Sequence, residues 1–170
     1  SEFKFNPKQR INIRREFGVE DKFVIGHVGR MTEQKNHPFL LEVFKEYLKI
    51  NKDAVLLLIG DGEKRKQIED SVVSSNIADK VIFLGVKKNV SELYNAMDCF
   101  VFPSLFEGMP NTVIEAQTNG LTCLVADTIT SSVKISSNNT FCPLNNPKSW
   151  ANLIVKSSNR DDAYKSVIKA

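Results

Sequence analysis

Residues 102–115 form the segment Phe-Pro-Ser-Leu-Phe-Glu-Gly-Met-Pro-Asn-Thr-Val-Ile-Glu. It continues the apolar run Cys99–Phe102, which predicts a buried strand. Gly108 and the prolines on either side of it then predict a loop. Pro110 is expected to open a helix, because the N–H that proline lacks has no intrahelical partner at the first helical position. The stretch therefore predicts a strand, a loop and a helix in direct succession.

The start of that helix is a candidate anion site. The amides of Asn111, Thr112 and Val113 are expected to point outward, where the positive end of the helix dipole favours negative charge. Two carboxylates flank the site, Glu107 on the loop and Glu115 about a turn and a half into the helix. A single glutamate here would usually be a solvated side chain, so the functional reading depends on the pair and its flanks.

Composition describes an ordinary globular domain. The chain has 170 residues, enough for one domain with a substantial core, and 42% of them are apolar and 25% charged. A net charge of +3, with cations scattered among acids, gives no reason to expect a nucleic-acid partner. No run reaches the ~18 apolar residues of a membrane span. The first residues, Ser1-Glu-Phe-Lys, do not resemble a signal peptide, and 1–3 are equally consistent with a cloning remnant.

The three cysteines, Cys99, Cys123 and Cys142, lack metal-ligand spacing. Two of them lie inside apolar runs, so we expect buried thiols in a reducing, cytoplasmic setting. No Asp-x-Asp pair is present, and no metal site is expected.

Strand-like runs alternate with helical runs along the chain. The predicted strands are residues 23–28, 54–59, 81–84, 99–102, 121–126 and a short 140–142. The first predicted helix is basic and covers 8–17, with Ile11 and Phe17 packing on the domain. The second starts at 36 or 38, and the third carries Ile68, Val72 and Val73. The last three are a short helix from 89 or 91, one from 110, and one over 147–157. This alternation predicts an α/β, Rossmann-like domain with a parallel sheet of about six strands and helices on both faces.

Chemistry is expected at one edge of this sheet. In the common order 3-2-1-4-5-6, strands one and four are neighbours, and ligands bind at their carboxyl ends where the winding reverses. Arg30 and Lys35 follow strand one, and Glu107 follows strand four. Two cations and a helix start would suit a diphosphate, and carboxylates accept hydrogen bonds from sugar hydroxyls.

Each of these residues also has a structural interpretation. Gly29-Arg30 is by itself an ordinary turn, and Lys35 by itself an exposed loop lysine. His27 and His37 are expected to be packing or surface residues rather than acid–base groups. The segment 60–62, Gly-Asp-Gly, is expected to be a tight turn. No Gly-x-Gly-x-x-Gly follows the first strand, which disfavours a nicotinamide or flavin site.

The segment Glu107-Gly-Met-Pro, four residues and Glu115 resembles the paired-glutamate signature of retaining GT-B glycosyltransferases of family 4. The similarity runs from about residue 23 to 154, over the C-terminal, donor-binding domain of that family. Its other landmarks are Val28-Gly-Arg30 followed by Lys35, Leu58-Ile-Gly-Asp-Gly62, Val81-Ile-Phe-Leu-Gly85, Leu93-Tyr94 and Phe102-Pro-Ser104.

The resemblance implies a role for each matching residue. Arg30 and Lys35 would hold the diphosphate of a UDP- or GDP-sugar and stabilise the leaving group, and Glu107 would contact the transferred sugar. Glu115 would bind the ribose, and the backbone of 84–86 would meet the base. The implied substrate-binding positions are Gly29, Gly85, Val86, Gly108, Met109, Pro110, Asn111, Thr112 and Glu115. Catalysis without a metal or other cofactor is expected of the family.

The resemblance also implies a larger protein. Residues 22–158 would be the donor-binding domain, 1–21 a lead-in or interdomain segment, and 159–170 a polar tail or a truncated crossing segment. An N-terminal acceptor-binding domain would precede them, so the isolated domain is expected to be inactive. The full-length protein would glycosylate a glycan or lipid-linked acceptor in bacterial polysaccharide synthesis (capsule or exopolysaccharide). It would be cytoplasmic, with any peripheral association with the inner face of the membrane made through the absent parts.

Three alternatives stay open. One is a nucleotide-sugar epimerase of GT-B-like fold, although histidines are sparse. Another is a non-catalytic binding module, such as one subunit of a split glycosyltransferase. A phosphate-binding receiver or flavodoxin-like domain is a more distant possibility, since such domains lack a paired-glutamate loop.

Overall fold

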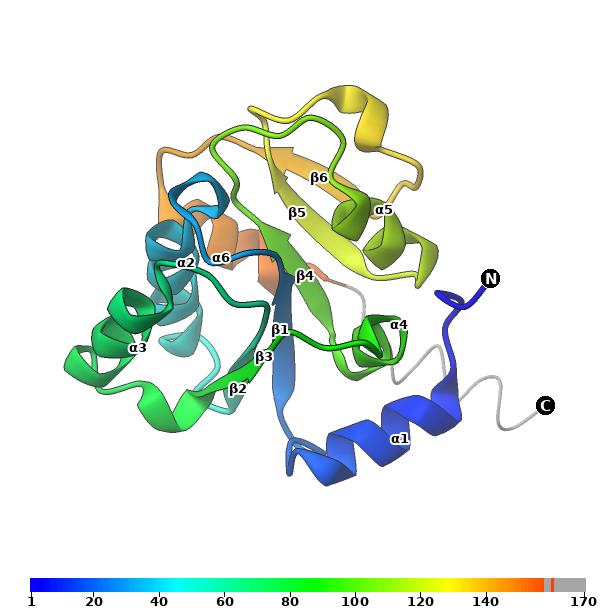
Figure 1. The fold of residues 1–170 in the computed structure, drawn as a ribbon, viewed down its shortest axis with the longest axis horizontal. Coiled ribbons are helices and arrows are strands. Elements are labelled where there is room, and N and C mark those ends of the chain that lie inside the picture. Colours follow the sequence, from blue (N-terminus) through cyan, green and yellow to red (C-terminus); the bar gives the residue numbers. More distant parts are fainter. Residues whose placement is uncertain (158–159, 161–170) are drawn as a thin grey trace.

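One parallel sheet organises the computed structural model, which describes residues 1–157 and 160 (Figure 1). Its order is β3-β2-β1-β4-β5-β6, and every neighbouring pair is parallel. The strands are β1 Phe23–Val28, β2 Ala54–Ile59, β3 Val81–Gly85, β4 Cys99–Phe102, β5 Thr122–Ala126 and β6 Asn139–Cys142. The predicted Rossmann-like α/β fold, with its strand order, is therefore confirmed.

Helices cover both faces of the sheet (Figure 1). Helices α2 (His37–Leu48), α3 (Arg65–Ser74) and α6 (Pro147–Val155) pack on one face. Helices α1 (Pro7–Glu16), α4 (Val90–Leu93) and α5 (Asn111–Thr118) pack on the other. Short 3-10 turns are η1 Glu33–Lys35, η2 Ala78–Lys80, η3 Tyr94–Ala96 and η4 Ser131–Val133.

Two apolar cores follow from this layering. In β2, Leu56 and Leu58 belong to the core under α2, α3 and α6, whereas Leu57 and Ile59 belong to the opposite core. All four are at most 2% exposed, which explains why the strand reads as a continuous apolar run rather than an alternating one. The three cysteines are buried free thiols, as predicted.

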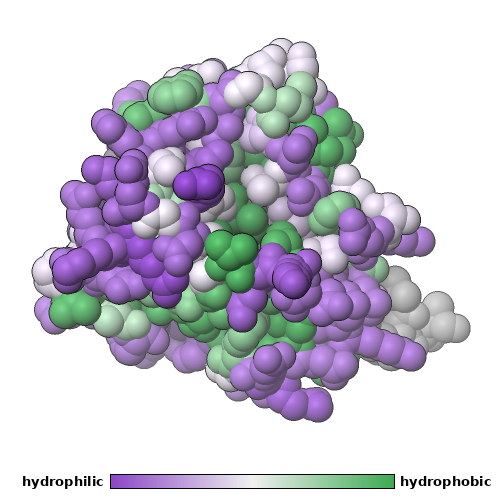
Figure 2. Space-filling model, in the orientation of Figure 1, coloured by the Kyte–Doolittle hydropathy of each residue, from purple (hydrophilic) through white to green (hydrophobic). Residues whose placement is uncertain are grey.

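The surface is mostly polar. Hydrophilic residues cover most of the face seen in Figure 2, with an apolar patch near its centre. In the described part of the chain, no helix combines the length and the hydropathy needed to cross a bilayer.

Four local predictions were wrong. Helix α5 begins at Asn111, one residue after the predicted start, because Pro110 is extended (ψ 99°) and serves as the N-cap. The amide of Val113 is not free, since it donates to Pro110 O at 3.1 Å. Val73 is 65% exposed and Ile11 39% exposed, because each lies off the apolar face that its helix presents to the core.

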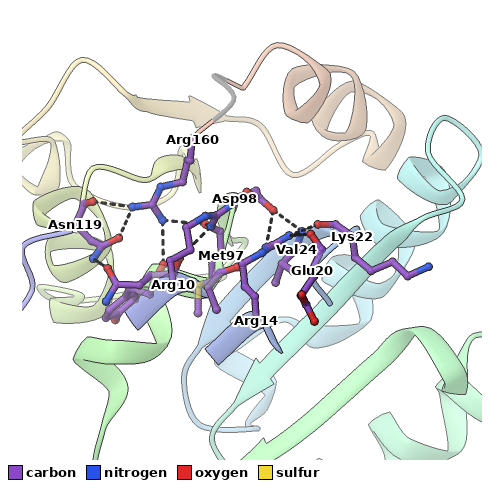
Figure 3. A network of polar contacts seen from close by, with 12 residues as sticks. Arg10, Arg14, Glu20, Lys22, Val24, Met97, Asp98, Asn119 and Arg160 are labelled. Carbon is purple, nitrogen blue, oxygen red and sulfur yellow. Dashed lines mark hydrogen bonds and ion pairs between the residues drawn. The ribbon is translucent and has the colours of Figure 1, made fainter. Parts of the chain in front are cut away.

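A buried charged cluster joins α1 to the sheet (Figure 3). Asp98, the residue before β4, accepts a hydrogen bond from Arg10 Nη2 at 2.6 Å and from Arg14 Nη1 at 3.2 Å. The same carboxylate accepts from the backbone N of Val24 in β1 at 2.8 Å. Sequence reasoning assigned α1 to a lead-in segment, and in the structure that helix packs against the domain through these contacts.

Arg160 extends this network toward the far end of the chain (Figure 3). Its Nη1 donates to Met97 O at 2.8 Å, and its Nη2 donates to Asn119 Oδ1 at 2.6 Å. The rest of the predicted polar tail 159–170 lies outside the described residues.

Asp98→Asn should destabilise the domain strongly. It removes the carboxylate that faces two buried guanidinium groups, and breaking a buried pair in this way costs roughly 3–5 kcal/mol. The free energy of unfolding from urea titration measures this loss. Asp53→Asn is the control, because its pair with Lys22 is exposed and should contribute no more than about 1 kcal/mol. Equal losses for the two variants would contradict the structural role of Asp98.

Candidate functional site

The candidate site lies where the winding of the sheet reverses, between β1 and β4. These strands pair through Ile25↔Cys99 and Gly26↔Phe100, so the loops that follow them leave the sheet side by side. Two hydrogen bonds join the loops: Leu105 N donates to Gln34 O at 2.9 Å, and Asn36 Nδ2 donates to Pro103 O at 3.0 Å. The two loops therefore form one edge of the sheet.

Lys35 and Glu107 form an ion pair across this edge. Ser104 Oγ donates to the same carboxylate oxygen, Glu107 Oε1, at 3.1 Å. The Lys35 ammonium also lies 5.2 Å from the ring centroid of Phe102. The side chains of Lys35 and Glu107 are only 17% and 9% exposed, so Lys35 is not the exposed loop lysine of the structural interpretation. Phe102 and Ser104 were identified from sequence only as landmarks of the family resemblance, and no role at the site was predicted for either.

Glycines let the backbones of this edge approach one another. A Cβ at Gly29 would lie 3.2 Å from His27 Nε2 and 3.3 Å from Lys35 Cδ. Gly60 has φ +128°, and a Cβ there would lie 2.1 Å from Gly29 O. The segment 60–62 packs on the loop after β1, with Gly60 in an isolated bridge to Gly85. The turn predicted for 60–62 lies slightly later, at residues 63–64, where Arg65 N donates to Gly62 O at 3.1 Å.

An open hollow of about 360 Å³ lies beyond the ends of β1 and β2, and three of the predicted site residues line it: Gly29, Arg30 and Val86. Arg30 is exposed at its wall. The other lining residues are Val28, Ile59, Gly60, Asp61, Gly62, Lys87 and Val90. Gly85 is not among them, and its carbonyl accepts a hydrogen bond from Gly60 N at 2.8 Å. Lys87, a second cation at this hollow, was missed because only the lysine and arginine after the first strand were considered.

Glu115 faces Tyr94 at the end of α4. Tyr94 Oη lies 3.4 Å from Glu115 Oε2 and 3.3 Å from Thr112 O, within donating distance of both. Partial burial raises the pKa of Glu115 above its ordinary value, against the hydrogen bond from Tyr94. Burial, together with the Glu115 carboxylate, raises the pKa of Tyr94, so the phenol stays a donor. Val90, four residues before Tyr94, lines the hollow, whereas Glu115, Glu107 and Lys35 do not.

The remaining predicted positions lie along the loop into α5. Gly108, Met109 and Asn111 are exposed, Thr112 is half-buried, and Pro110 is buried. A Cβ at Gly108 would meet nothing within 4 Å. Within residues 1–157 and 160, no group of three or more His, Cys, Asp or Glu side chains is arranged to hold a metal ion.

Two buried histidines lie beneath Lys35. His27 and His37 pack edge to face with ring centroids 4.8 Å apart, and His27 Nδ1 donates to Val101 O at 2.9 Å. Burial lowers the pKa of His27 to about 3 and that of His37 to about 4, and the nearby Lys35 charge contributes to both. Both rings are therefore neutral at pH 7, as expected of packing residues rather than acid–base groups.

The fold and this edge describe an α/β domain with a cationic, carboxylate-flanked site at the switch point of its sheet. The family model "Glycosyl transferases group 1" matches residues 9–170, and the chain belongs to that family.

Curated relatives agree with this assignment. EpsF of Bacillus subtilis, named as a glycosyltransferase, is 41% identical over 113 residues, which are 66% of this chain and 29% of EpsF. An Escherichia coli enzyme named UDP-Gal:alpha-D-GlcNAc-diphosphoundecaprenol alpha-1,3-galactosyltransferase is 34% identical over 110 residues, which are 63% of this chain and 28% of that enzyme. The chain thus matches less than a third of the length of these relatives.

Solved structures show the same fold. Anabaena HepE, solved with UDP and glucose, superposes with a TM-score of 0.81 at 21% identity, over 91% of this chain and 44% of HepE. The C-terminal domain of the Francisella tularensis group 1 glycosyl transferase LpcC superposes with a TM-score of 0.76 at 20% identity, over 91% of this chain and 84% of that one. The fold is that of GT-B glycosyltransferase structures.

Acid should destabilise the domain through the two histidines. Their unfolded pKa is near 6.5 and their folded values are about 3 and about 4, so the unfolded chain binds more protons between these values. The free energy of unfolding is therefore highest above pH 6.5. Below pH 6.5, and down to the folded pKa values, each ring lowers it by up to about 1.4 kcal/mol per pH unit. Urea titrations from pH 7 to pH 5 should show this slope, and His37→Phe should reduce it by about half. An unchanged slope in His37→Phe would contradict the buried, neutral state of that ring.

Proposed function

We propose that this domain binds the nucleotide-sugar donor of a retaining, family 4-like glycosyltransferase, as the C-terminal half of a two-domain enzyme. The observation that carries the proposal is the Lys35–Glu107 ion pair at the switch point. The hollow lined by Arg30 is next to this pair, because Gly29, which also lines it, lies beside the Lys35 side chain. The hollow offers backbone and apolar walls for a base and ribose. The pair offers a cation for phosphate and a carboxylate for sugar hydroxyls.

The chemistry of glycosyl transfer fits this assignment of the hollow to base and ribose and of the ion pair to phosphate and sugar. As the glycosidic bond to phosphate breaks, positive charge develops at the anomeric carbon and negative charge on the leaving diphosphate. Arg30, Lys35 and the N-terminus of α5 would stabilise that diphosphate, which is transition-state stabilisation by fixed charges and needs no metal. Glu107 would accept hydrogen bonds from the transferred sugar, next to the backbone of 108–110.

Glu115 would bind the ribose hydroxyls. Its carboxylate already accepts from one hydroxyl, that of Tyr94, and Val90, at the opposite end of α4 from Tyr94, lines the hollow. The Escherichia coli relative is named for a UDP-sugar donor and a lipid-linked acceptor, which favours UDP over GDP and such an acceptor here. Relatives named for amylovoran and Vi polysaccharide biosynthesis support a role in bacterial polysaccharide synthesis. A location at the cytoplasmic side of the membrane is part of the proposal.

Calorimetric titration with UDP and GDP tests the proposal. UDP should bind, and both Lys35→Ala and Glu115→Ala should weaken it by at least about tenfold, or 1.4 kcal/mol. Thr118→Ala is the matched control for Glu115, because it lies on the same helix with an exposed side chain. UDP affinity that is unaffected by both site variants would contradict the assigned roles.

The isolated domain should not transfer sugar. Half of the expected cleft, including the acceptor site, would belong to the N-terminal domain, so a radiolabelled UDP-sugar should yield no glycosylated product with this chain alone. Robust transfer would refute the two-domain proposal. Release of free epimerised sugar nucleotide by the full-length protein would instead favour the epimerase alternative, and restoration of activity by a separately encoded partner would favour a split transferase.

A further inference from the structure

Tyr94, the first residue of η3, is a buried tyrosine whose hydroxyl faces a candidate site residue. Its side chain is 0% exposed, and its ring packs edge to face on Phe100 of β4, with ring centroids 5.9 Å apart. The hydroxyl lies 3.4 Å from Glu115 Oε2 and 3.3 Å from Thr112 O, and both of these acceptors belong to α5. This hydroxyl therefore links η3 to the helix that carries Glu115.

The backbone that carries Tyr94 is held by the buried arginines of the network in Figure 3. Each of four consecutive carbonyls, those of residues 94–97, accepts a hydrogen bond from a guanidinium group. Arg160 donates to Tyr94 O at 3.0 Å and to Met97 O at 2.8 Å, Arg10 donates to Asn95 O at 2.9 Å, and Arg14 donates to Ala96 O at 2.7 Å. A backbone fixed at four successive carbonyls, together with a buried ring, gives the Tyr94 hydroxyl a fixed position.

The hydroxyl acts on Glu115 as a donor. A carbonyl and a carboxylate both accept, so the Tyr94 proton must point toward them. Burial, together with the Glu115 carboxylate, raises the pKa of Tyr94, so this proton stays in place at neutral pH. Partial burial raises the pKa of Glu115, whereas the hydrogen bond from Tyr94 lowers it. The contact therefore favours the ionised form of Glu115, which is the form that accepts hydrogen bonds from ligand hydroxyls.

One oxygen of Glu115 is held and the other is free. Glu115 is half-buried, and its second oxygen, Oε1, accepts no hydrogen bond from the described residues. That oxygen is also not sealed inside the part of the protein that the structure describes. A glutamate carboxylate that is already oriented loses less rotational freedom when a ligand binds to it.

We propose that Tyr94 is a positioning residue for Glu115: its hydroxyl holds Oε2 and so directs Oε1 toward the ribose hydroxyls of the donor. The inference rests on the proposed nucleotide-sugar function, and it adds a residue that does not itself touch the donor. It also gives the buried arginine cluster a part in the site, because that cluster fixes the backbone from which Tyr94 projects.

The first measurement needs no ligand. Tyr94→Phe keeps the ring and removes the hydroxyl, so the pKa of Glu115 should rise further above its ordinary value once the hydrogen bond is lost. Titration of the ¹³C-labelled Glu115 carboxyl by NMR measures this pKa in both proteins. An unchanged pKa would show that the hydroxyl does not hold the carboxylate, and it would overturn the proposal.

The second measurement isolates the ribose. Calorimetry compares UDP with 2′,3′-dideoxy-UDP, which lacks both ribose hydroxyls. In Tyr94→Phe the affinity for UDP should fall by about three- to tenfold, the range of one ordinary hydrogen bond, while that for the dideoxy nucleotide stays unchanged. Tyr47→Phe is the matched control, because Tyr47 is a tyrosine buried in the core on the opposite face of the sheet. It should leave both affinities unchanged.

Glu115→Ala separates failure of this inference from failure of the proposed function. If Glu115→Ala abolishes the preference for UDP over the dideoxy nucleotide but Tyr94→Phe retains it in full, Tyr94 is not a positioning residue and the ribose role of Glu115 stands. If the unaltered chain binds the two nucleotides equally, the ribose role itself is wrong, and the inference about Tyr94 is overturned with it.

Discussion

The pairing of β1 with β4 is the constraint on which the rest of this structure depends. At that pair the sheet reverses its winding, so the loops after the two strands must leave the same edge side by side. The Lys35–Glu107 ion pair lies across the reversal, with Ser104 and the Phe102 ring beside it. Because both side chains are largely removed from solvent, the loss of either partner would leave a poorly solvated charge. This contact therefore links the topology of the sheet to the chemistry of its edge.

Much of the fold could be predicted from sequence because its strands are buried on both faces. Such strands read as continuous apolar runs, and the predicted bounds of β1, β2 and β4 match the observed ones. The order of the strands was predicted from a general property of doubly wound sheets. That order places Lys35 and Glu107 at one edge of the sheet. Helix starts were less accurate, since proline is compatible with both the N-cap and the first helical position, and Pro110 takes the extended N-cap conformation.

Side-chain partners distant in sequence could not be predicted. Asp98 lies 88 residues from Arg10, and sequence marks neither as buried; a lone carboxylate before a strand and a basic helix suggest solvated surfaces. The same holds for Tyr94, which the sequence marked only as part of a family landmark and which proved to be the hydroxyl partner of Glu115. His37 was expected to be a packing or surface residue, and no pattern in the sequence indicates that its ring is buried without a hydrogen-bond partner among the described residues.

The central claim is that a nucleoside diphosphate binds at the edge between β1 and β4, and backbone amide shifts of the ¹⁵N-labelled chain titrated with UDP test it most directly. The claim predicts saturable shifts concentrated at Gly29–Met31, at Val86–Val90 and at the first residues of α5. Shifts confined to other parts of the molecule, while calorimetry reports binding, would contradict it.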